Sequence, residues 1–184
     1  AGTKYINGHS DVLIGFVSSD KKNAKPIRVA TKTLGICPGS EEVYLAIRGL
    51  PTLNIRMKQI ESNALNLANE LNAHPLVDKV YHPALESSKN HHIWKRDFTG
   101  SSGLFSFSLK KFYTQNKIKK MFSKISVFKL GYSWGGFDSL ITFPPLSKRK
   151  FKTQLKGNLI RIYCGLEDSI DQINDIVNSL KTLK

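Results

Sequence analysis

The chain has 184 residues, a formal net charge of +14, and 40% hydrophobic and 23% charged residues. This length holds one domain, or one small domain with part of another, and can bury a sizeable core. The sequence predicts neither a membrane span nor a secretory signal, because it has no run of about 18 apolar residues and no basic start ahead of an apolar stretch with a cleavage site. The histidines and the two cysteines, Cys37 and Cys164, lack metal-ligand spacing, which favours reduced thiols in a cytoplasmic protein without a metal.

The positive charge is high for this length, as in proteins that bind nucleic acid or other anions. The lysines are spread along the chain, however, and no zinc-finger or ribonucleoprotein motif accompanies them. Because charge by itself governs solubility and non-specific attraction, we interpret the lysines as a solvated basic surface and do not expect a nucleic-acid partner.

The N-terminal part is predicted to contain a loop, a strand and a short helix. Residues 12–18 are mostly apolar and predict a buried strand after the first loop. Residues 19–23 are polar and predict a connection, and the segment after them shows no clear period. Ser40 followed by two glutamates predicts a helix start, because a hydroxyl caps the first turn and acids suit the positive end of the helix dipole. This helix is expected to stop at Arg48-Gly49.

A long helix opens the second part of the chain at Pro51, since proline is tolerated at the first helical position and apolar residues recur every three or four positions after it. It is expected to end before His74-Pro75. We place a domain boundary near residues 49–51, which divides the chain into residues 1–50 and 51–184. Strands are predicted at residues 77–81, 103–109, 127–130 and 158–165, and helices at residues 114–125 and from Asp168 or Ser169 onward. The alternation of helices and short strands indicates an α/β fold.

Lys4 is the first candidate for chemistry, because it lies in a loop ahead of an apolar segment. A lysine becomes a covalent catalyst when its surroundings lower its pKa, so that the free amine attacks a carbonyl and forms a Schiff base. An ordinary surface lysine is the alternative, and Lys4 considered alone favours it.

Arg161 is the second candidate, because it lies in the middle of an apolar strand. A guanidinium there needs an anion, and its planar fork fits a carboxylate bidentately. The anion is either the carboxylate of a ligand or an internal acid such as Glu167 or Asp168, and spacing alone does not separate the two.

A third candidate is the stretch Tyr132-Ser133-Trp134-Gly135-Gly136, in which aromatic rings and a hydroxyl precede two glycines. Glycine lets another backbone come close. A tight turn with two packing aromatic rings is the alternative interpretation.

These stretches carry a resemblance to a known family. Residues 3–11, Thr3-Lys4-Tyr5-Ile6-Asn7-Gly8-His9-Ser10-Asp11, resemble the lysine motif of the pyridoxal phosphate-dependent enzymes of cysteine and methionine metabolism, which include cystathionine lyases and synthases. Arg48-Gly49-Leu50, Thr52-Leu53 and Arg56 are similar to the same family. Residues 94–107 and 132–136 look like its beta-lyase branch, because the gamma branches usually carry a smaller aliphatic residue where Trp134 stands.

The resemblance implies the type I, aspartate aminotransferase-like fold of pyridoxal phosphate-dependent transferases. Residues 1–50 would be the end of the large cofactor domain, and residues 51–184 the small C-terminal α/β domain. It also implies a role for each candidate. Lys4 would form a Schiff base with pyridoxal 5'-phosphate (PLP), and the Thr3 hydroxyl would touch its phosphate. Arg161 would bind the α-carboxylate of a small amino-acid substrate beside a wall of Tyr132, Ser133 and Trp134.

Two departures from the family pattern limit what this chain is expected to do alone. Ala1 stands where the family usually has a serine, and the lysine of the family lies midway along a chain about twice this long. In the family that it resembles, the half before the lysine carries the phosphate-binding amides, the ring that stacks on the cofactor and the aspartate that pairs with the pyridine nitrogen. We therefore expect a C-terminal fragment that works only with its N-terminal half or in a homo-oligomer.

The expected reaction is cleavage of the Cβ–S bond of cystathionine to homocysteine, pyruvate and ammonia, with no activity from the chain alone. One alternative is a non-catalytic oligomerising or anion-binding module left from such an enzyme. The other is a different PLP-dependent carbon–sulfur lyase or a gamma-type member of the family.

Overall fold

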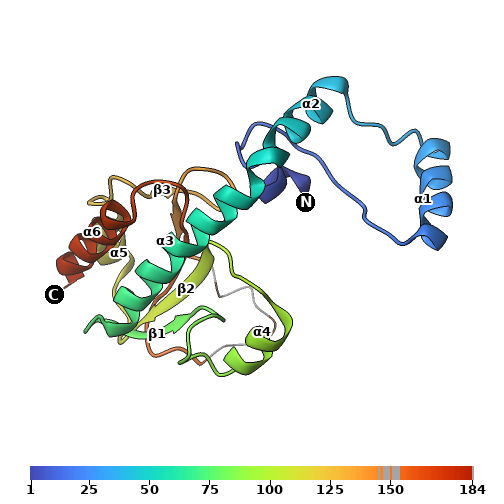
Figure 1. The fold of residues 1–184 in the computed structure, drawn as a ribbon. Coiled ribbons are helices and arrows are strands. Elements are labelled where there is room, and N and C mark those ends of the chain that lie inside the picture. Colours follow the sequence, from blue (N-terminus) through green and yellow to red (C-terminus); the bar gives the residue numbers. More distant parts are fainter. Residues whose placement is uncertain (145, 147–149, 151–153, 184) are drawn as a thin grey trace.

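The computed structural model describes residues 1–144, 146, 150 and 154–183 (Figure 1). It confirms an α/β fold. The elements in chain order are η1 (Gly2–Ile6), α1 (Lys21–Thr33), α2 (Ser40–Gly49), η2 (Leu50–Thr52), α3 (Leu53–Ala73), β1 (Val77–Tyr81), α4 (His91–Asp97), β2 (Leu104–Leu109), α5 (Gln115–Phe122), β3 (Lys129–Leu130), β4 (Leu140–Thr142), β5 (Leu159–Tyr163), α6 (Ser169–Leu180) and η4 (Lys181–Leu183).

Five strands form one mixed sheet in the order β1-β2-β5-β4-β3. The β1/β2, β2/β5 and β4/β5 pairs are antiparallel, and β3/β4 is parallel. Phe105 pairs with Ile162 and Phe107 with Ile160, and all four side chains are buried. Because alternate residues of a strand face the same side of a sheet, these four form an apolar floor.

Helix α3 covers this floor. The residues on its buried face are fully enclosed and recur every three or four positions, namely Ile60, Ala64, Leu67, Ala68 and Leu71. Helix α6 packs beside α3, and the Asp168 carboxylate caps it by accepting from the backbone N–H groups of Ile170 and Asp171. In Figure 1, α3 runs diagonally across the sheet and continues toward the N-terminal residues.

Most predictions for the second part of the chain are confirmed, with shorter bounds. The predicted strands become β1, β2, β3 and β5, and the predicted helices become α3, α5 and α6. The long helix begins at Leu53, because Pro51 lies in the 3-10 turn η2 that precedes it. Helix α4 and strand β4 were not predicted, since seven and three residues are too few to show a hydrophobic period.

The predicted strand at residues 12–18 is wrong. This segment is extended but pairs with no strand in the part of the chain that the structure describes. Its apolar side chains are largely in solvent, with Leu13 87% and Val17 73% exposed. A strand needs a neighbour for its backbone N–H and C=O groups, and none of the five described strands lies beside this segment.

Helix α1 contradicts the predicted connection at residues 19–23. The Asp20 carboxylate accepts from the backbone N–H of Asn23 and caps the helix. Pro26 lies in its second turn, where it obscures the helical pattern. None of the residues of α1 is buried.

The domain boundary near residue 50 stays a prediction. The backbone at Leu50 is helical, with φ −62° and ψ −43°, so α2 passes through η2 into α3 without a linker. Across the described ranges, no helix is long and apolar enough to cross a membrane, and no group of three or more His, Cys, Asp or Glu side chains could hold a metal ion.

Candidate active site

Lys4 lies in the short helical turn η1, where its backbone leaves helical geometry at φ −89° and ψ −118°. Thr3 fixes the turn to the extended segment. The backbone N–H of Thr3 donates to the Ile14 carbonyl oxygen at 3.1 Å, and the Ile14 N–H donates to Thr3 Oγ1 at 2.9 Å. The Thr3 hydroxyl donates back to the Ile14 carbonyl at 3.2 Å. The predicted phosphate contact of Thr3 would therefore have to replace this last bond.

Arg56 fastens the same loop to α3. Its guanidinium donates to the carbonyl oxygens of Tyr5 at 2.7 Å, Ile6 at 3.2 Å and Gly49 at 2.8 Å. The side chain is buried, and burial lowers the pKa of Arg56. Gly8, with φ +74°, passes so close that any side chain there would collide with the guanidinium. Arg56 was noted in the sequence only as part of the family resemblance, and its bonds to carbonyl oxygens leave no pattern that would have revealed this role.

The structure brings the Lys4 loop together with the stretch at residues 132–136. Lys4 Nζ donates to Ser133 Oγ at 2.8 Å and lies 4.4 Å from the centroid of the Trp134 ring. A cation at this distance is attracted to the negative face of the indole. Residues 129 positions apart in the sequence thus meet at one amine.

The two glycines after Trp134 make this approach feasible. A Cβ on Gly135, which has φ +85°, would lie 2.8 Å from the Lys4 Cβ. Gly136 is held in turn by the Tyr163 hydroxyl, which donates to its carbonyl oxygen at 2.7 Å. Burial raises the pKa of Tyr163, so this hydroxyl keeps its proton. The interpretation that a glycine here admits another backbone is confirmed for Gly135, where a Cβ would lie 2.9 Å from the Lys4 Cα, whereas Gly136 faces the side chain of Ser10.

Arg161 projects from β5 toward the same stretch. Its guanidinium donates to the Tyr132 carbonyl oxygen at 2.5 Å, and its Cζ lies 6.0 Å from the centroid of the Trp134 ring. Partial burial lowers the pKa of Arg161. The internal salt bridge considered from the sequence does not form, because Glu167 accepts from the N–H and hydroxyl of Ser139 and Asp168 caps α6.

A cavity of about 370 Å³ opens around Lys4. This volume lies in the range of small-molecule sites. Its lining residues are Thr3, Lys4, Ser10, Asp11, Val12, Leu13, Ser133 and Trp134. Tyr132 and Arg161 lie beyond this lining. Ser10 and Asp11 were not predicted to line the cavity. Their position in the same sequence motif as Lys4 could have indicated it.

The lining fits one side of a PLP site. An amine beside hydroxyl groups and an indole face suits a cofactor that carries an aldehyde. Among the described residues that line the cavity, Lys4 is the only cation, so nothing else there balances a phosphate charge. The single carboxylate, Asp11, accepts from the Asn7 side-chain amide at 2.7 Å. This arrangement fits an enzyme that holds an aldehyde cofactor through a lysine.

The chain belongs to the family of Cys/Met metabolism PLP-dependent enzymes, whose family model matches residues 1–181. It is 41% identical over 181 residues to the cystathionine beta-lyase of Escherichia coli, which covers 96% of this chain. It is 38% identical over 188 residues to the L-alanine/L-glutamate racemase of Wolbachia pipientis, which covers 100% of it. A cystathionine gamma-lyase of Sus scrofa is 36% identical over 190 residues and covers 98%.

The chain spans only 46% of the length of each of these relatives. The expectation that this chain corresponds to about half of a longer family member is thus confirmed. The relatives carry three different activities in their names, so membership of the family does not by itself distinguish among these reactions.

Proposed function

We propose that the chain supplies the lysine-bearing half of a PLP-dependent carbon–sulfur lyase, which cleaves cystathionine with water to homocysteine, pyruvate and ammonia. The observation that carries the proposal is the hydrogen bond of 2.8 Å from Lys4 Nζ to Ser133 Oγ. It joins the lysine motif at residues 3–11 to the motif at residues 132–136. The similarity to cystathionine beta-lyases and the presence of Trp134 favour the beta-lyase reaction over the gamma-type reaction.

Lys4 has two tasks in this proposal. Its amine would hold the cofactor, and in its free form the same amine would move the proton at the substrate Cα. The cofactor, when bound, supplies the electron sink that makes loss of this proton feasible. Ser133 orients the amine through its hydrogen bond, and the face of the Trp134 ring attracts the amine when it is charged.

Arg161 is proposed to bind the substrate α-carboxylate. Its guanidinium is partly buried and has no carboxylate partner in the part of the chain that the structure describes. A substrate carboxylate would supply the missing negative charge. The Trp134 ring, which both Arg161 and Lys4 approach, would form one wall of the substrate site. Tyr132 contributes its carbonyl oxygen to hold the guanidinium in place.

The chain by itself is proposed to be inactive. The described lining around Lys4 offers no second cation for a phosphate, and the Asp11 carboxylate is already bonded to Asn7. The other groups that a PLP site needs would come from the half of the relatives that this chain does not match. In this proposal the residues of that half complete the site at the Lys4 cavity.

Mixing tests the proposal. The chain, PLP and cystathionine are combined with a separately produced fragment of the Escherichia coli relative that covers the part not matched here, and pyruvate is measured. We expect pyruvate from the mixture, its loss with Lys4→Ala, and no loss with Lys124→Ala, which removes an exposed lysine. Equal activity of the two variants would remove Lys4 from the mechanism, and no pyruvate from any mixture would contradict the proposal.

A racemase is the second candidate, because one relative is named an L-alanine/L-glutamate racemase. Racemisation needs a proton donor on the face of Cα opposite the lysine. Among the described lining residues, Asp11 is the other ionisable group, and its carboxylate is bonded to Asn7. The same mixture given L-alanine separates the candidates: D-alanine without pyruvate from cystathionine would favour the racemase. Cysteine and 2-oxobutyrate as products would instead identify a gamma-type enzyme.

A further inference from the structure

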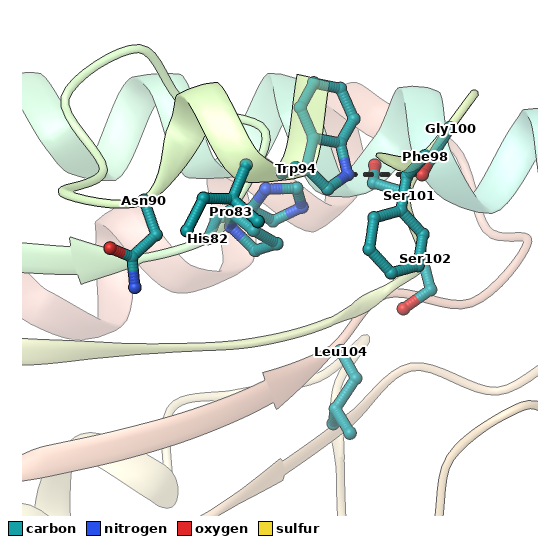
Figure 2. Close-up of a pocket in the computed structure, with 10 residues that line it drawn as sticks. His82, Pro83, Asn90, Trp94, Phe98, Gly100, Ser101, Ser102 and Leu104 are labelled. Carbon is teal, nitrogen blue, oxygen red and sulfur yellow. Dashed lines mark hydrogen bonds between the residues drawn. The ribbon is translucent and has the colours of Figure 1, made fainter. Parts of the chain in front are cut away.

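A second cavity, of about 510 Å³, lies between α4 and β2 and shares no lining residue with the Lys4 cavity. Figure 2 shows it beneath the Trp94 ring and above Leu104, with Asn90 at one end and Ser102 at the other. The residues that line it are His82, Pro83, Asn90, Ile93, Trp94, Phe98, Gly100, Ser101, Ser102 and Leu104. Neither the family membership nor the proposed function gives it a task.

The wall of this cavity carries no charge, although the chain has a net charge of +14. None of its described lining residues is Lys, Arg, Asp or Glu. The one ionisable side chain is His82, whose Nδ1 accepts from the backbone N–H of Ala84 at 3.2 Å. Burial lowers the pKa of His82, so its imidazole is neutral near pH 7. A charged ligand would lose water here without meeting an opposite charge.

Internal bonds occupy two further polar groups of the wall. The Trp94 indole N–H donates to the Gly100 carbonyl oxygen at 3.3 Å, as the dashed line in Figure 2 marks. The Ser101 hydroxyl donates to a Glu61 carboxylate oxygen at 3.1 Å, which points this bond toward α3. The faces left for a ligand are therefore mainly the rings and aliphatic side chains of Trp94, Phe98 and Leu104.

The two ends of the cavity are polar. Asn90 carries a side-chain amide that can both donate and accept, and at the other end Ser102 carries a hydroxyl that also interacts with the Tyr5 hydroxyl. Aromatic faces with one or two polar groups at the ends select a flat ligand by stacking and orient it by hydrogen bonding.

We propose that this cavity binds a small, uncharged, planar heteroaromatic molecule. The ligand stacks against Trp94 and Phe98 and exchanges a hydrogen bond with Asn90 or Ser102. The site is distinct in chemistry from the Lys4 cavity, where a zwitterionic amino acid would meet a cation. Its existence does not depend on the proposed lyase reaction, and it can be tested on the chain alone.

The test uses 5-fluoroindole as the probe and the line width of its fluorine NMR signal with the 184-residue chain. We expect saturable broadening with a dissociation constant of about 1 mM or tighter, as for a fragment-sized ligand. The carboxylate analogue 5-fluoroindole-3-acetate is the control for charge, and we expect it to bind about tenfold more weakly. Non-specific attraction to a chain of charge +14 would give the opposite order and overturn the proposal.

Two matched variants locate the binding. Phe98 lines the cavity and is 62% exposed, whereas Phe112 is 67% exposed and does not line it. Phe98→Ala should weaken 5-fluoroindole binding about 5- to 10-fold through loss of stacking, and Phe112→Ala should leave it unchanged. Because both side chains are exposed, neither variant removes core packing. Equal weakening by both variants, or no saturable binding to the unaltered chain, would overturn the proposal.

Discussion

Residues 11–50 and residues 53–183 differ sharply in how much of their apolar surface they bury. The second region has one apolar core that runs from α3 through the sheet to α6. The first region, called the arm below, buries little and extends away from that core in Figure 1. Its exposed large hydrophobic side chains are Leu13, Phe16, Val17, Val29, Leu34, Ile36, Val43, Tyr44, Ile47 and Leu50.

This contrast teaches that the two regions have different sources of stability. Apolar side chains stabilise a fold only when they leave water, at about 25 cal/mol per Å². The described part of the second region does this by itself, whereas the arm presents an apolar surface of the kind that marks an interaction site. In the proposed enzyme, the arm would be the surface that packs against the part of the relatives that this chain does not match.

The candidate site lies where the two regions meet. Arg56 fixes the Lys4 loop to α3, and Tyr163 fixes Gly136 beneath it. The arm supplies Val12 and Leu13 to the cavity wall. The compact region therefore positions the Lys4 amine, and the arm leaves one side of its cavity to be completed.

The largest contrast should appear between a core and an arm leucine. Leu67 is fully buried in α3, and Leu34 at the end of α1 is 71% exposed. We expect Leu67→Ala to lower the free energy of unfolding by about 3 kcal/mol, through lost burial and a cavity. Leu34→Ala should change it by about 0.5 kcal/mol or less. Urea unfolding followed by circular dichroism measures both, and similar losses would show that the arm packs as tightly as the core.

The next effect concerns the hydrogen bonds of Arg56, which join α3 to the Lys4 loop and to Gly49 of the arm. Arg56→Met keeps much of the side-chain volume but leaves the carbonyl oxygens of Tyr5 and Gly49 without their donor, so we expect a loss of about 2–3 kcal/mol in unfolding free energy. The exposed Arg48 is the control, and Arg48→Met should cost about 0.5 kcal/mol or less. Urea unfolding followed by circular dichroism measures the unfolding free energy of both variants. If the two variants are equally stable, Arg56 does not hold the loop.

A smaller effect should follow from Tyr163→Phe, which removes only the hydroxyl that donates to Gly136. We expect a loss of about 1 kcal/mol in unfolding free energy. The emission of Trp134 should also change, because the turn that carries it is no longer held. Tyr132→Phe removes the hydroxyl of an exposed side chain and should change neither the unfolding free energy nor the Trp134 emission. Unaltered stability and emission in Tyr163→Phe would count against this anchor.

The smallest effect is a pH dependence from His82. Burial lowers its pKa below the ordinary value of 6.5, so the unfolded chain binds more protons than the folded chain between these two pKa values. The stabilisation from the neutral ring is complete above about pH 6.5 and is lost as the pH falls from there toward the folded pKa. His82→Gln should flatten this part of the stability profile, and the exposed His92→Gln should not. A profile that His82→Gln leaves unchanged would contradict the assignment.

The same contrast explains what could be predicted from the sequence. Helix α3, helix α6 and the central strands follow from their hydrophobic periods, because their partners lie in the same chain. The predicted strand at residues 12–18 failed because an apolar run specifies burial but not the partner that provides it. The local sequence pattern of residues 12–18 does not specify which surface, if any, lies beside them.

The site was predictable to a similar degree. Lys4 and the stretch that holds Ser133 and Trp134 were candidates from the residues alone, and the resemblance to the family gave them roles. The structure brings them together. The role of Arg56 was not predicted, since bonds to carbonyl oxygens of a distant loop depend on the fold and not on a motif. The catalytic roles of Lys4 and Arg161 stay proposals.

Pyruvate release from cystathionine by the 184-residue chain alone, with PLP present, tests the central claim most directly. The claim is that Lys4 is the reactive amine of a site of which this chain holds one half. The account predicts no pyruvate above the background measured with Lys4→Ala. Sustained pyruvate release that Lys4→Ala abolishes would contradict it, because the chain would then contain the complete site.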